Sequence, residues 1–296
     1  MRTLRFSLLV SLVSLLIFPC NSPAEDGWKQ ADLGGIRIAY QDLGPRDAPA
    51  LVLIHGWSCD STFWRMQVPA FSERYRLLVP DLPGFGRSAK PQEIHYSMAF
   101  FAKAVKAVVD DARAQKPALV GHSMGFAVVR QYLIDYPGGV RGVCSVDGAL
   151  FTVPEQPEAR SQWNKEMEAF REGFSSPNRA ARVNAFIEDT FYQKTAQALR
   201  PTIKKTMAAA DAYAANSALY EMCRPEQWKP RHFAVPALAV YAVHPDYPMD
   251  NEADLRKVFP GSLTFIEWDD LGHYIMLEAP DRFNKALADF LDTLPE

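Results

Sequence analysis

The pentapeptide Gly121-His122-Ser123-Met124-Gly125 decides how this chain is interpreted. An apolar segment at 117–120 precedes it and a helix-forming run at 126–133 follows it, so the sequence predicts a strand that turns sharply into a helix at Ser123. A serine at the apex of such a turn sits in a strained backbone conformation, and a glycine on either side leaves the turn the space it needs. The strain holds the hydroxyl out of the sheet, so the stretch predicts a nucleophilic serine.

The composition is that of an ordinary globular protein. Of the 296 residues, 48% are hydrophobic and 23% are charged, which is enough chain for one sizeable core. The formal net charge is −3, so no broad basic field indicates binding to nucleic acid. The sequence lacks a histidine pair at i, i+4 spacing beside a carboxylate, and it lacks a Gly-x-Gly-x-x-Gly after the first strand. Neither a metal nor any other cofactor is therefore predicted.

The first 24 residues are predicted to be a secretory signal peptide. Two arginines precede an apolar run at residues 6–18, and Ser22-Pro23-Ala24 offers the small residues that a signal peptidase reads. The run is shorter than the about 20 residues that span a bilayer, so no stable membrane insertion is expected after cleavage at Ala24. An uncleaved anchor and, because of Cys20, a lipoprotein are the alternatives. The mature protein is expected in the periplasm or outside the cell.

Cleavage would leave Cys59, Cys144 and Cys223 in the mature chain. An odd number of cysteines does not indicate a disulfide framework. Cys144 lies in an apolar, strand-like run and is expected to be a buried small hydrophobe. Export would permit a bridge between Cys59 and Cys223, and the sequence leaves that question open.

Apolar runs of strand length alternate with helical stretches after the signal peptide. Runs that are apolar on both faces are typical of a buried parallel sheet, and their alternation with helices indicates a doubly wound α/β fold. The predicted strands are residues 28–33, 36–41, 50–54, 76–79, 117–120, 140–146, 237–243 and 263–268. The predicted helices are residues 63–73, 98–114, 124–135, 251–259 and 281–294.

Residues 151–232 interrupt this alternation. They are rich in Ala, Glu, Arg and Lys and carry helical patterning with several prolines. We interpret them as a helical cap inserted into an α/β core made of residues 25–150 and 233–296. A separate helical domain without a role in substrate binding is the alternative.

From about residue 28 to its end, the chain resembles the α/β-hydrolase superfamily, and in particular its serine esterases with a helical cap. The resemblance rests on four motifs that occur in the order of the family. They are His55-Gly56-Trp57 followed by Trp64, Asp81-Leu82-Pro83-Gly84-Phe85-Gly86-Arg87-Ser88, Gly121-His122-Ser123-Met124-Gly125, and Gly272-His273 followed by Glu278-Ala279-Pro280. The resemblance implies a mostly parallel sheet of the α/β-hydrolase type, and it is less specific for any one reaction because this fold hosts many.

The resemblance implies a catalytic triad. A serine hydroxyl needs an adjacent base, and the resemblance assigns that role to His273. The acid falls between serine and histidine in the chain order of the family, so Asp246, which follows the strand at 236–243, is the predicted acid. A glycine commonly closes that strand where Ala242 stands here. Asp147 ends the preceding strand and is the alternative acid, because some relatives take it from that position.

Two backbone N–H groups are expected to stabilise the oxyanion of the tetrahedral intermediate. One belongs to Met124, the residue after the nucleophile, and the resemblance assigns the other to Trp57 in the loop after the third strand. Phe126 stands where many relatives have a third glycine. Its ring is expected either in the core or on the floor of the pocket.

The leading expectation is a secreted serine hydrolase that cleaves a carboxylic ester or lactone through an acyl-enzyme, with a small-molecule acyl substrate. Epoxide hydrolases and haloalkane dehalogenases of the superfamily attack with an aspartate, so the serine favours acyl transfer. Cleavage of an amide or an N-terminal proline peptide, carbon–carbon bond hydrolysis and perhydrolysis use the same triad and stay open. A ligand-binding receptor on a hydrolase scaffold is the alternative of a different class. The natural substrate, the acyl chain length and the oligomeric state are not predicted.

Overall fold

A computed structural model of the chain describes residues 27–174, 179–190, 197–243 and 251–295. The predicted signal peptide, Cys20 and the predicted acid Asp246 lie outside these ranges.

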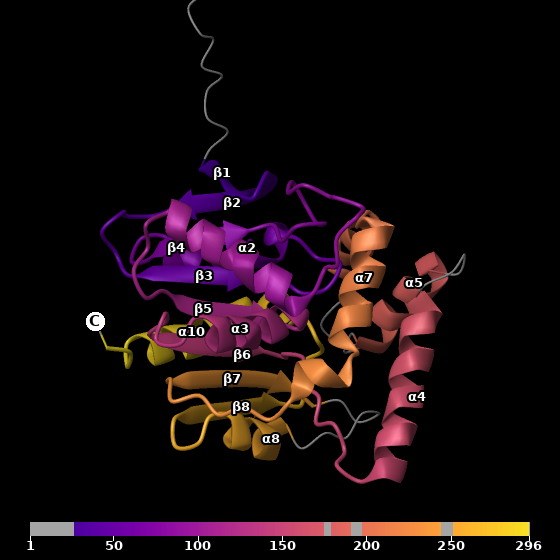
Figure 1. The fold of residues 1–296 in the computed structure, drawn as a ribbon. Helices are drawn as coiled ribbons and strands as arrows, with labels where there is room; N and C mark the ends of the chain where they lie inside the picture. The colour runs from indigo at the N-terminus through magenta and orange to yellow at the C-terminus, as the bar shows by residue number, and fades with distance from the viewer. Residues whose placement is uncertain (1–26, 175–178, 191–196, 244–250, 296) are drawn as a thin grey trace, which may run out of the picture.

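Within the described ranges, eight strands form one sheet in the order β1-β2-β4-β3-β5-β6-β7-β8 (Figure 1). Strands β1 and β2 pair with each other antiparallel, β2 pairs antiparallel with β4, and the other pairs are all parallel. Every residue of β3 to β7 is buried, as the apolar runs predicted. The strands are β1 (Trp28–Leu33), β2 (Ile36–Leu43), β3 (Ala50–Ile54), β4 (Arg76–Pro80), β5 (Ala118–His122), β6 (Gly142–Val146), β7 (Ala237–Ala242) and β8 (Leu263–Trp268). The predicted α/β, mostly parallel fold is therefore confirmed.

Helices pack on the two faces of the sheet. In Figure 1, α2 and α3 lie side by side in front of the strands and α10 lies behind them. The hydroxyl of Ser97 accepts a hydrogen bond from the N–H of Phe100 and so caps α2. The helices outside residues 151–232 are η1 (Ser61–Trp64), α1 (Val68–Phe71), α2 (Met98–Asp111), α3 (Met124–Asp135), α8 (Asn251–Val258), α9 (Ile275–Glu278) and α10 (Pro280–Leu291).

Five helical elements are described between β6 and β7, within the segment 151–232 that is predicted to be a cap. They are α4 (Pro157–Phe174), α5 (Arg179–Thr190), α6 (Arg200–Ala208), α7 (Ala212–Met222) and η2 (Pro225–Trp228). Figure 1 shows α4, α5 and α7 beyond the arrowheads of the strands, which is the carboxyl edge of the parallel sheet. Aromatic rings hold this segment together, with Phe174 5.2 Å from Phe170 and 5.7 Å from Phe186 between centroids.

The structure shows where the Phe126 ring lies and whether Cys59 and Cys223 form a disulfide, which the sequence left open. Phe126 is fully buried, and its ring centroid lies 6.3 Å from that of Phe259, so it belongs to the core. Cys59, Cys144 and Cys223 are buried and free, so the structure does not contain the bridge that export would permit.

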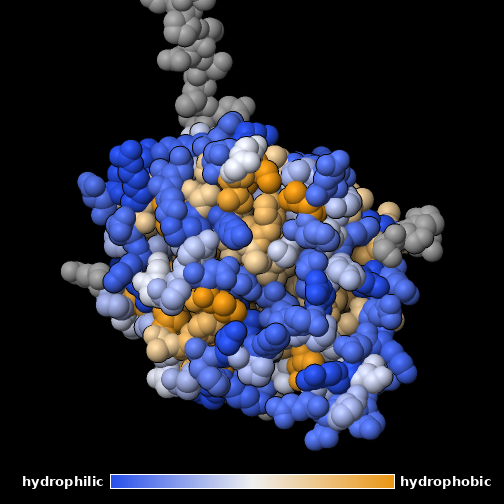
Figure 2. Space-filling view, in the orientation of Figure 1, coloured by the Kyte–Doolittle hydropathy of each residue, from blue (hydrophilic) through white to orange (hydrophobic). Residues whose placement is uncertain are grey.

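The face of the molecule that Figure 2 shows is mostly polar. Figure 2 shows hydrophilic side chains over most of one face, with apolar groups scattered between them. Among the described residues, none of the helices has both the length and the apolar character needed to cross a bilayer.

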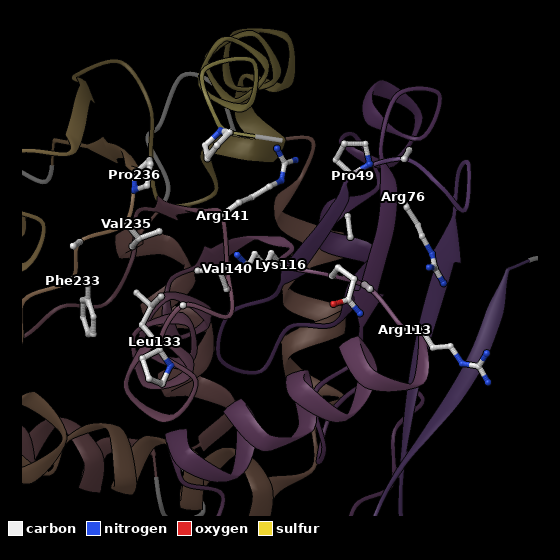
Figure 3. Close-up of a pocket in the computed structure, with 18 of the residues that line it drawn as sticks. Pro49, Arg76, Arg113, Lys116, Leu133, Val140, Arg141, Phe233, Val235 and Pro236 are labelled. Carbon is white, nitrogen blue, oxygen red and sulfur yellow. The ribbon is translucent and has the colours of Figure 1, made fainter.

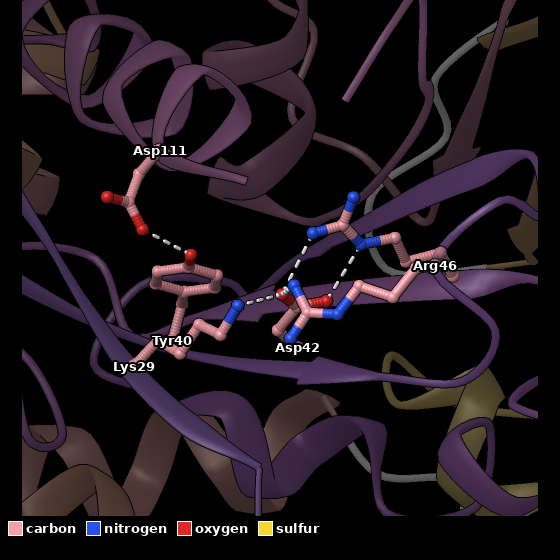
Figure 4. A network of polar contacts seen from close by, with 6 residues as sticks. Lys29, Tyr40, Asp42, Arg46 and Asp111 are labelled. Atoms are coloured by element: carbon pink, nitrogen blue, oxygen red, sulfur yellow. Dashed lines mark hydrogen bonds and ion pairs between the residues drawn. The ribbon is translucent and has the colours of Figure 1, made fainter. Parts of the chain in front are cut away.

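The Asp42 carboxylate ties the antiparallel edge of the sheet together (Figure 4). It accepts two hydrogen bonds of 2.9 Å from Arg76 on β4 and one of 2.6 Å from Lys29 on β1. Arg46 adds a longer contact of 3.1 Å. Burial by itself raises the pKa of the Asp42 carboxyl, but the hydrogen bonds from Arg76 and Lys29 outweigh burial and hold this pKa at about 2.

We expect the Asp42 network to stabilise the fold in a pH-dependent way. The folded-state pKa of about 2 lies below the ordinary value of 3.8, so this stabilisation is complete above about pH 5 and is lost progressively as the pH falls through 2. Asp42→Asn should lower the free energy of unfolding by about 3 kcal/mol at neutral pH, because it leaves Arg76 buried without its counter-ion. It should also flatten the loss of stability between about pH 5 and 2. Urea unfolding across this range measures both effects, with the exposed Asp269→Asn as control. A variant whose stability falls as steeply with acid as that of the parent would contradict the assignment.

Candidate active site

Ser123 stands at the turn between β5 and α3 in a conformation that residues with side chains rarely adopt, with φ of 53° and ψ of −123°. The glycines beside it are required by close backbone contacts. A Cβ at Gly121 would lie 2.5 Å from the carbonyl carbon of Gly125, and a Cβ at Gly125 would lie 2.4 Å from the carbonyl oxygen of Ile54. The strand, sharp turn and helix that the pentapeptide predicts are therefore present, and they hold Ser123 at the carboxyl edge of the sheet.

His273, in the loop between β8 and α9, contacts Asp147 at the end of β6. Its Nδ1 lies 2.6 Å from Asp147 Oδ2, and both side chains are largely buried. The other oxygen of Asp147 accepts a hydrogen bond of 3.1 Å from the N–H of Ala242. A carboxylate at Nδ1 holds the imidazole proton there and leaves the basic lone pair on Nε2. The pair thus has the geometry of a general base with its orienting acid.

The structure brings His273 together with Asp147, the acid that the sequence analysis kept as the alternative. Asp246, the predicted acid, lies outside the described residues. The sequence carried a signal for Asp147, because Ala242 stands where a glycine commonly closes the strand before Asp246. In the structure the N–H of Ala242 donates to Asp147.

The turn that carries Asp147 rests on a buried hydrogen-bond network that sequence reasoning missed. The Tyr241 hydroxyl donates to the carbonyl of Gly148 at 2.9 Å and lies 2.9 Å from Ser145 Oγ. Burial raises the pKa of Tyr241, so the phenol keeps its proton and remains a donor. Asp147 itself has a positive φ of 43°, and these contacts hold its strained backbone in place.

His122, which precedes Ser123, supports the loop of the proposed base. Its Nε2 lies 3.0 Å from the carbonyl oxygen of His273, and a carbonyl can only accept, so Nε2 carries the proton. Burial, reinforced by the nearby His273, lowers the pKa of His122 to about 3. His122 is therefore a neutral donor to the His273 backbone, a role that the sequence did not reveal.

The Gly56–Trp57 peptide is held in one orientation by His55. The carbonyl of Gly56 accepts hydrogen bonds from His55 Nδ1 at 2.8 Å and from the N–H of Cys59 at 3.2 Å. His55 Nε2 accepts from the N–H of Leu82, so the imidazole proton sits on Nδ1. The peptide is trans, so the N–H of Trp57 points away from this anchored carbonyl. Such a fixed N–H is what a preformed oxyanion site requires.

Met124 is the first residue of α3. Its N–H therefore has no acceptor four residues earlier within the helix, and it lies at the positive end of the helix dipole. Met124 and Trp57 are the two donors that the sequence analysis proposes for the oxyanion.

The Trp57 side chain joins its loop to the helical segment above the sheet. The indole Nε1 donates a hydrogen bond of 2.7 Å to the carbonyl of Ala215 in α7. The ring packs edge-on against Phe174 of α4 and Phe186 of α5, at centroid distances of 5.0 and 6.3 Å. The loop with the proposed oxyanion donor is thus attached to three of the inserted helices.

Ser123 and His273 line the same small cavity of about 40 Å³. This volume holds on the order of one to three non-hydrogen atoms. Its other lining residues are Trp57, Cys59, His122, Phe170, Phe186, Met207, Leu219, Met222 and Tyr274. Burial raises the pKa of the Cys59 thiol well above its usual range, so the thiol stays neutral and does not compete as a nucleophile. Across the described part of the chain, no group of three or more His, Cys, Asp and Glu side chains could hold a metal ion.

Comparison with known proteins identifies the family of the chain and several related hydrolases. The family described as "alpha/beta hydrolase fold" matches residues 49–280. The pimeloyl-[acyl-carrier protein] methyl ester esterase of Aeromonas hydrophila is 35% identical over 117 residues, which are 39% of this chain and 42% of that protein. Epoxide hydrolase A of Mycobacterium tuberculosis is 30% identical over 131 residues, which are 44% of this chain and 39% of that protein. Among solved structures, a thermophilic esterase from Thermogutta terrifontis has a TM-score of 0.76 at 22% identity, covering 90% of this chain and 98% of its own.

These matches cover different shares of the chains. The aligned stretch spans less than half the length of both curated relatives. The likeness to the solved esterase covers nearly the whole chain, but at 22% identity it shows the fold alone.

We expect Asp147→Asn to lower kcat for p-nitrophenyl acetate by about 10³–10⁴-fold with little change in KM, because an amide does not hold the His273 tautomer or stabilise its cation. Asp246→Asn should keep most of the activity, and the exposed Asp269→Asn serves as control. Circular dichroism checks that each variant folds. If Asp246→Asn alone abolishes turnover, the contact between Asp147 and His273 is structural.

Proposed function

Because the chain belongs to the alpha/beta hydrolase fold family, we propose that it is a serine hydrolase that cleaves a carboxylic ester or lactone through an acyl-enzyme. One observation carries the proposal. Ser123 and His273 line one small cavity, and Asp147 contacts Nδ1 of His273, which leaves Nε2 as the basic nitrogen. The esterases among the related proteins support hydrolysis of esters in general.

In the proposed reaction, Ser123 Oγ attacks the substrate carbonyl while His273 Nε2 takes the hydroxyl proton. The charge that forms on the carbonyl oxygen is stabilised by the N–H groups of Trp57 and Met124, each of which contributes about 3–4 kcal/mol in comparable sites. His273 then gives its proton to the leaving alcohol. A water activated by the same nitrogen cleaves the acyl-enzyme, and the acid is released.

The nucleophile argues for acyl transfer over epoxide opening, although an epoxide hydrolase is among the relatives. A serine hydroxyl that opened an epoxide would form an alkyl ether with the enzyme. Water activated by a histidine does not readily cleave an ether, so the enzyme would stop after one turnover. The same serine acting on an ester forms an acyl ester, which such a water can hydrolyse.

The lining of the cavity supports an uncharged acyl group as substrate. Aromatic and aliphatic side chains, together with Cys59, the two histidines and the serine, form its walls, and none of the lining residues is Asp, Glu, Lys or Arg. A charged acyl group would lose its hydration there without gaining a counter-ion.

We also propose that the protein is exported and that its signal peptide is cleaved after Ala24. Expression of the full chain in a Gram-negative host should then yield a soluble mature protein that begins at Glu25. Intact-mass measurement of the periplasmic fraction distinguishes this product from an uncleaved chain and from a chain lipidated at Cys20, and either of those products would overturn the proposal.

Ser123→Ala should reduce turnover of p-nitrophenyl acetate by on the order of 10⁴-fold or more, and it should abolish the rapid first release of p-nitrophenol. The exposed Ser161→Ala is the matched control and should leave both unchanged. A panel of acyl esters, lactones and amides then ranks the substrate classes. Saturable binding of these compounds without any turnover that depends on Ser123 would favour the receptor over the enzyme.

A further inference from the structure

One cavity among the described residues lies at the opposite edge of the sheet from Ser123. It has a volume of about 1050 Å³, close to the upper limit of the sizes of small-molecule sites. Ala50 and Arg76 at the first positions of β3 and β4, and Lys116 just before β5, line it. Ser123 follows the last residue of β5, so the full length of that strand separates the two sites.

The polar lining of this cavity is almost entirely basic. The basic residues are Arg46, Arg76, Arg113, Lys116, Arg141 and His232, and Asp47 is the acidic one. Asp42, which does not line the cavity, forms ion pairs with Arg76 and Arg46 (Figure 4). Arg113, Lys116 and Arg141 make no ion pair with any described residue, and they concentrate positive charge in a chain whose net charge is −3.

Arg141 brings a partly buried cation to the cavity. Its Nε and Nη2 atoms are buried without a hydrogen-bond acceptor among the described residues. Burial lowers the pKa of Arg141, which reflects the cost of keeping its charge away from water. An anion that reached the guanidinium would offset this cost, since charge-assisted hydrogen bonds to guanidinium are among the strongest in proteins.

The end of the cavity that lies opposite Arg76 and Arg113 is apolar. Figure 3 shows Phe233, Val235 and Pro236 at one end, Arg76 and Arg113 at the other, and Arg141 and Lys116 between them. Val235 is buried and Phe233 half-buried, so this end offers an apolar surface beside the cations. The two ends together favour a ligand with a charged head and a short apolar tail over a bare inorganic ion.

We propose that this cavity, which no catalytic residue lines, binds an organic anion with a short alkyl or aryl tail. The head, a phosphate or a carboxylate, contacts Arg141, Lys116 and Arg113. The tail lies against Phe233 and Val235. The inference does not depend on the esterase activity, because the two sites share no residue.

Isothermal titration calorimetry with hexyl phosphate and with hexanoate tests the proposal and distinguishes the two heads. Inorganic phosphate and hexanol supply the head and the tail alone. We expect one site for at least one hexyl anion, at least tenfold weaker binding of inorganic phosphate, and no binding of hexanol. Arg141→Gln should weaken binding about tenfold or more. The double variant Arg113→Gln with Lys116→Gln should have the same effect. Because Arg113 and Lys116 are exposed, the double variant should fold like the parent. Raising the salt concentration should weaken binding.

Two controls separate this cavity from the active site. Lys165→Gln removes an exposed charge on α4 and should leave binding unchanged. Enzyme whose Ser123 carries a covalent phosphonate should bind hexyl phosphate as the free enzyme does, and all the cavity variants should keep the parent rate with p-nitrophenyl acetate. Binding that survives both Arg141→Gln and the double variant, binding that the phosphonate abolishes, or no binding of either hexyl anion would overturn the proposal.

Discussion

The close approach of β5, the Ser123 turn and the start of α3 is the constraint on which the rest of the structure depends. Gly121 and Gly125 face each other across the turn, and Gly125 also meets the carbonyl of Ile54 on β3. A side chain at either position would push the helix off the sheet. Because β5 lies between β3 and β6, the same turn positions Ser123 beside the Gly56–Trp57 loop and beside the end of β6, where Asp147 stands. The proposed nucleophile, the proposed oxyanion donors and the proposed acid are therefore positioned relative to one another by the alignment of these three strands.

Buried side chains then hold the backbone beside each candidate functional residue through hydrogen bonds. His55 holds the Gly56 carbonyl, His122 holds the His273 carbonyl, and the Tyr241 hydroxyl holds the turn after Asp147. All three side chains are buried. Burial lowers the pKa values of His55 and His122 and raises that of Tyr241, so the three groups are neutral at physiological pH. The candidate site is thus positioned by neutral hydrogen-bonding groups, which would not gain or lose charge as charges form in the proposed reaction.

Much of this could be predicted from sequence because the signals are local. The strand–turn–helix at Ser123 and the runs buried on both faces identified the sheet, since glycine sterics and apolar periodicity act between near neighbours in the chain. The partner of His273 was harder to predict, because Asp246 and Asp147 follow adjacent strands and the contact between Asp147 and His273 joins residues far apart in the sequence. The supporting roles of His122 and Tyr241 escaped prediction for the same reason, since their partners are 151 and 93 residues away.

The bond from the Trp57 indole to Ala215 has a consequence for how the inserted helices can be exchanged or evolve. Access to the serine and stabilisation of charge on the substrate are usually treated as separate problems, solved by different parts of a protein. Here a single residue would belong to both, because its backbone N–H is a proposed oxyanion donor while its ring contacts α4, α5 and α7. A replacement helical segment that lacks an acceptor for this indole would change substrate range and catalytic power together.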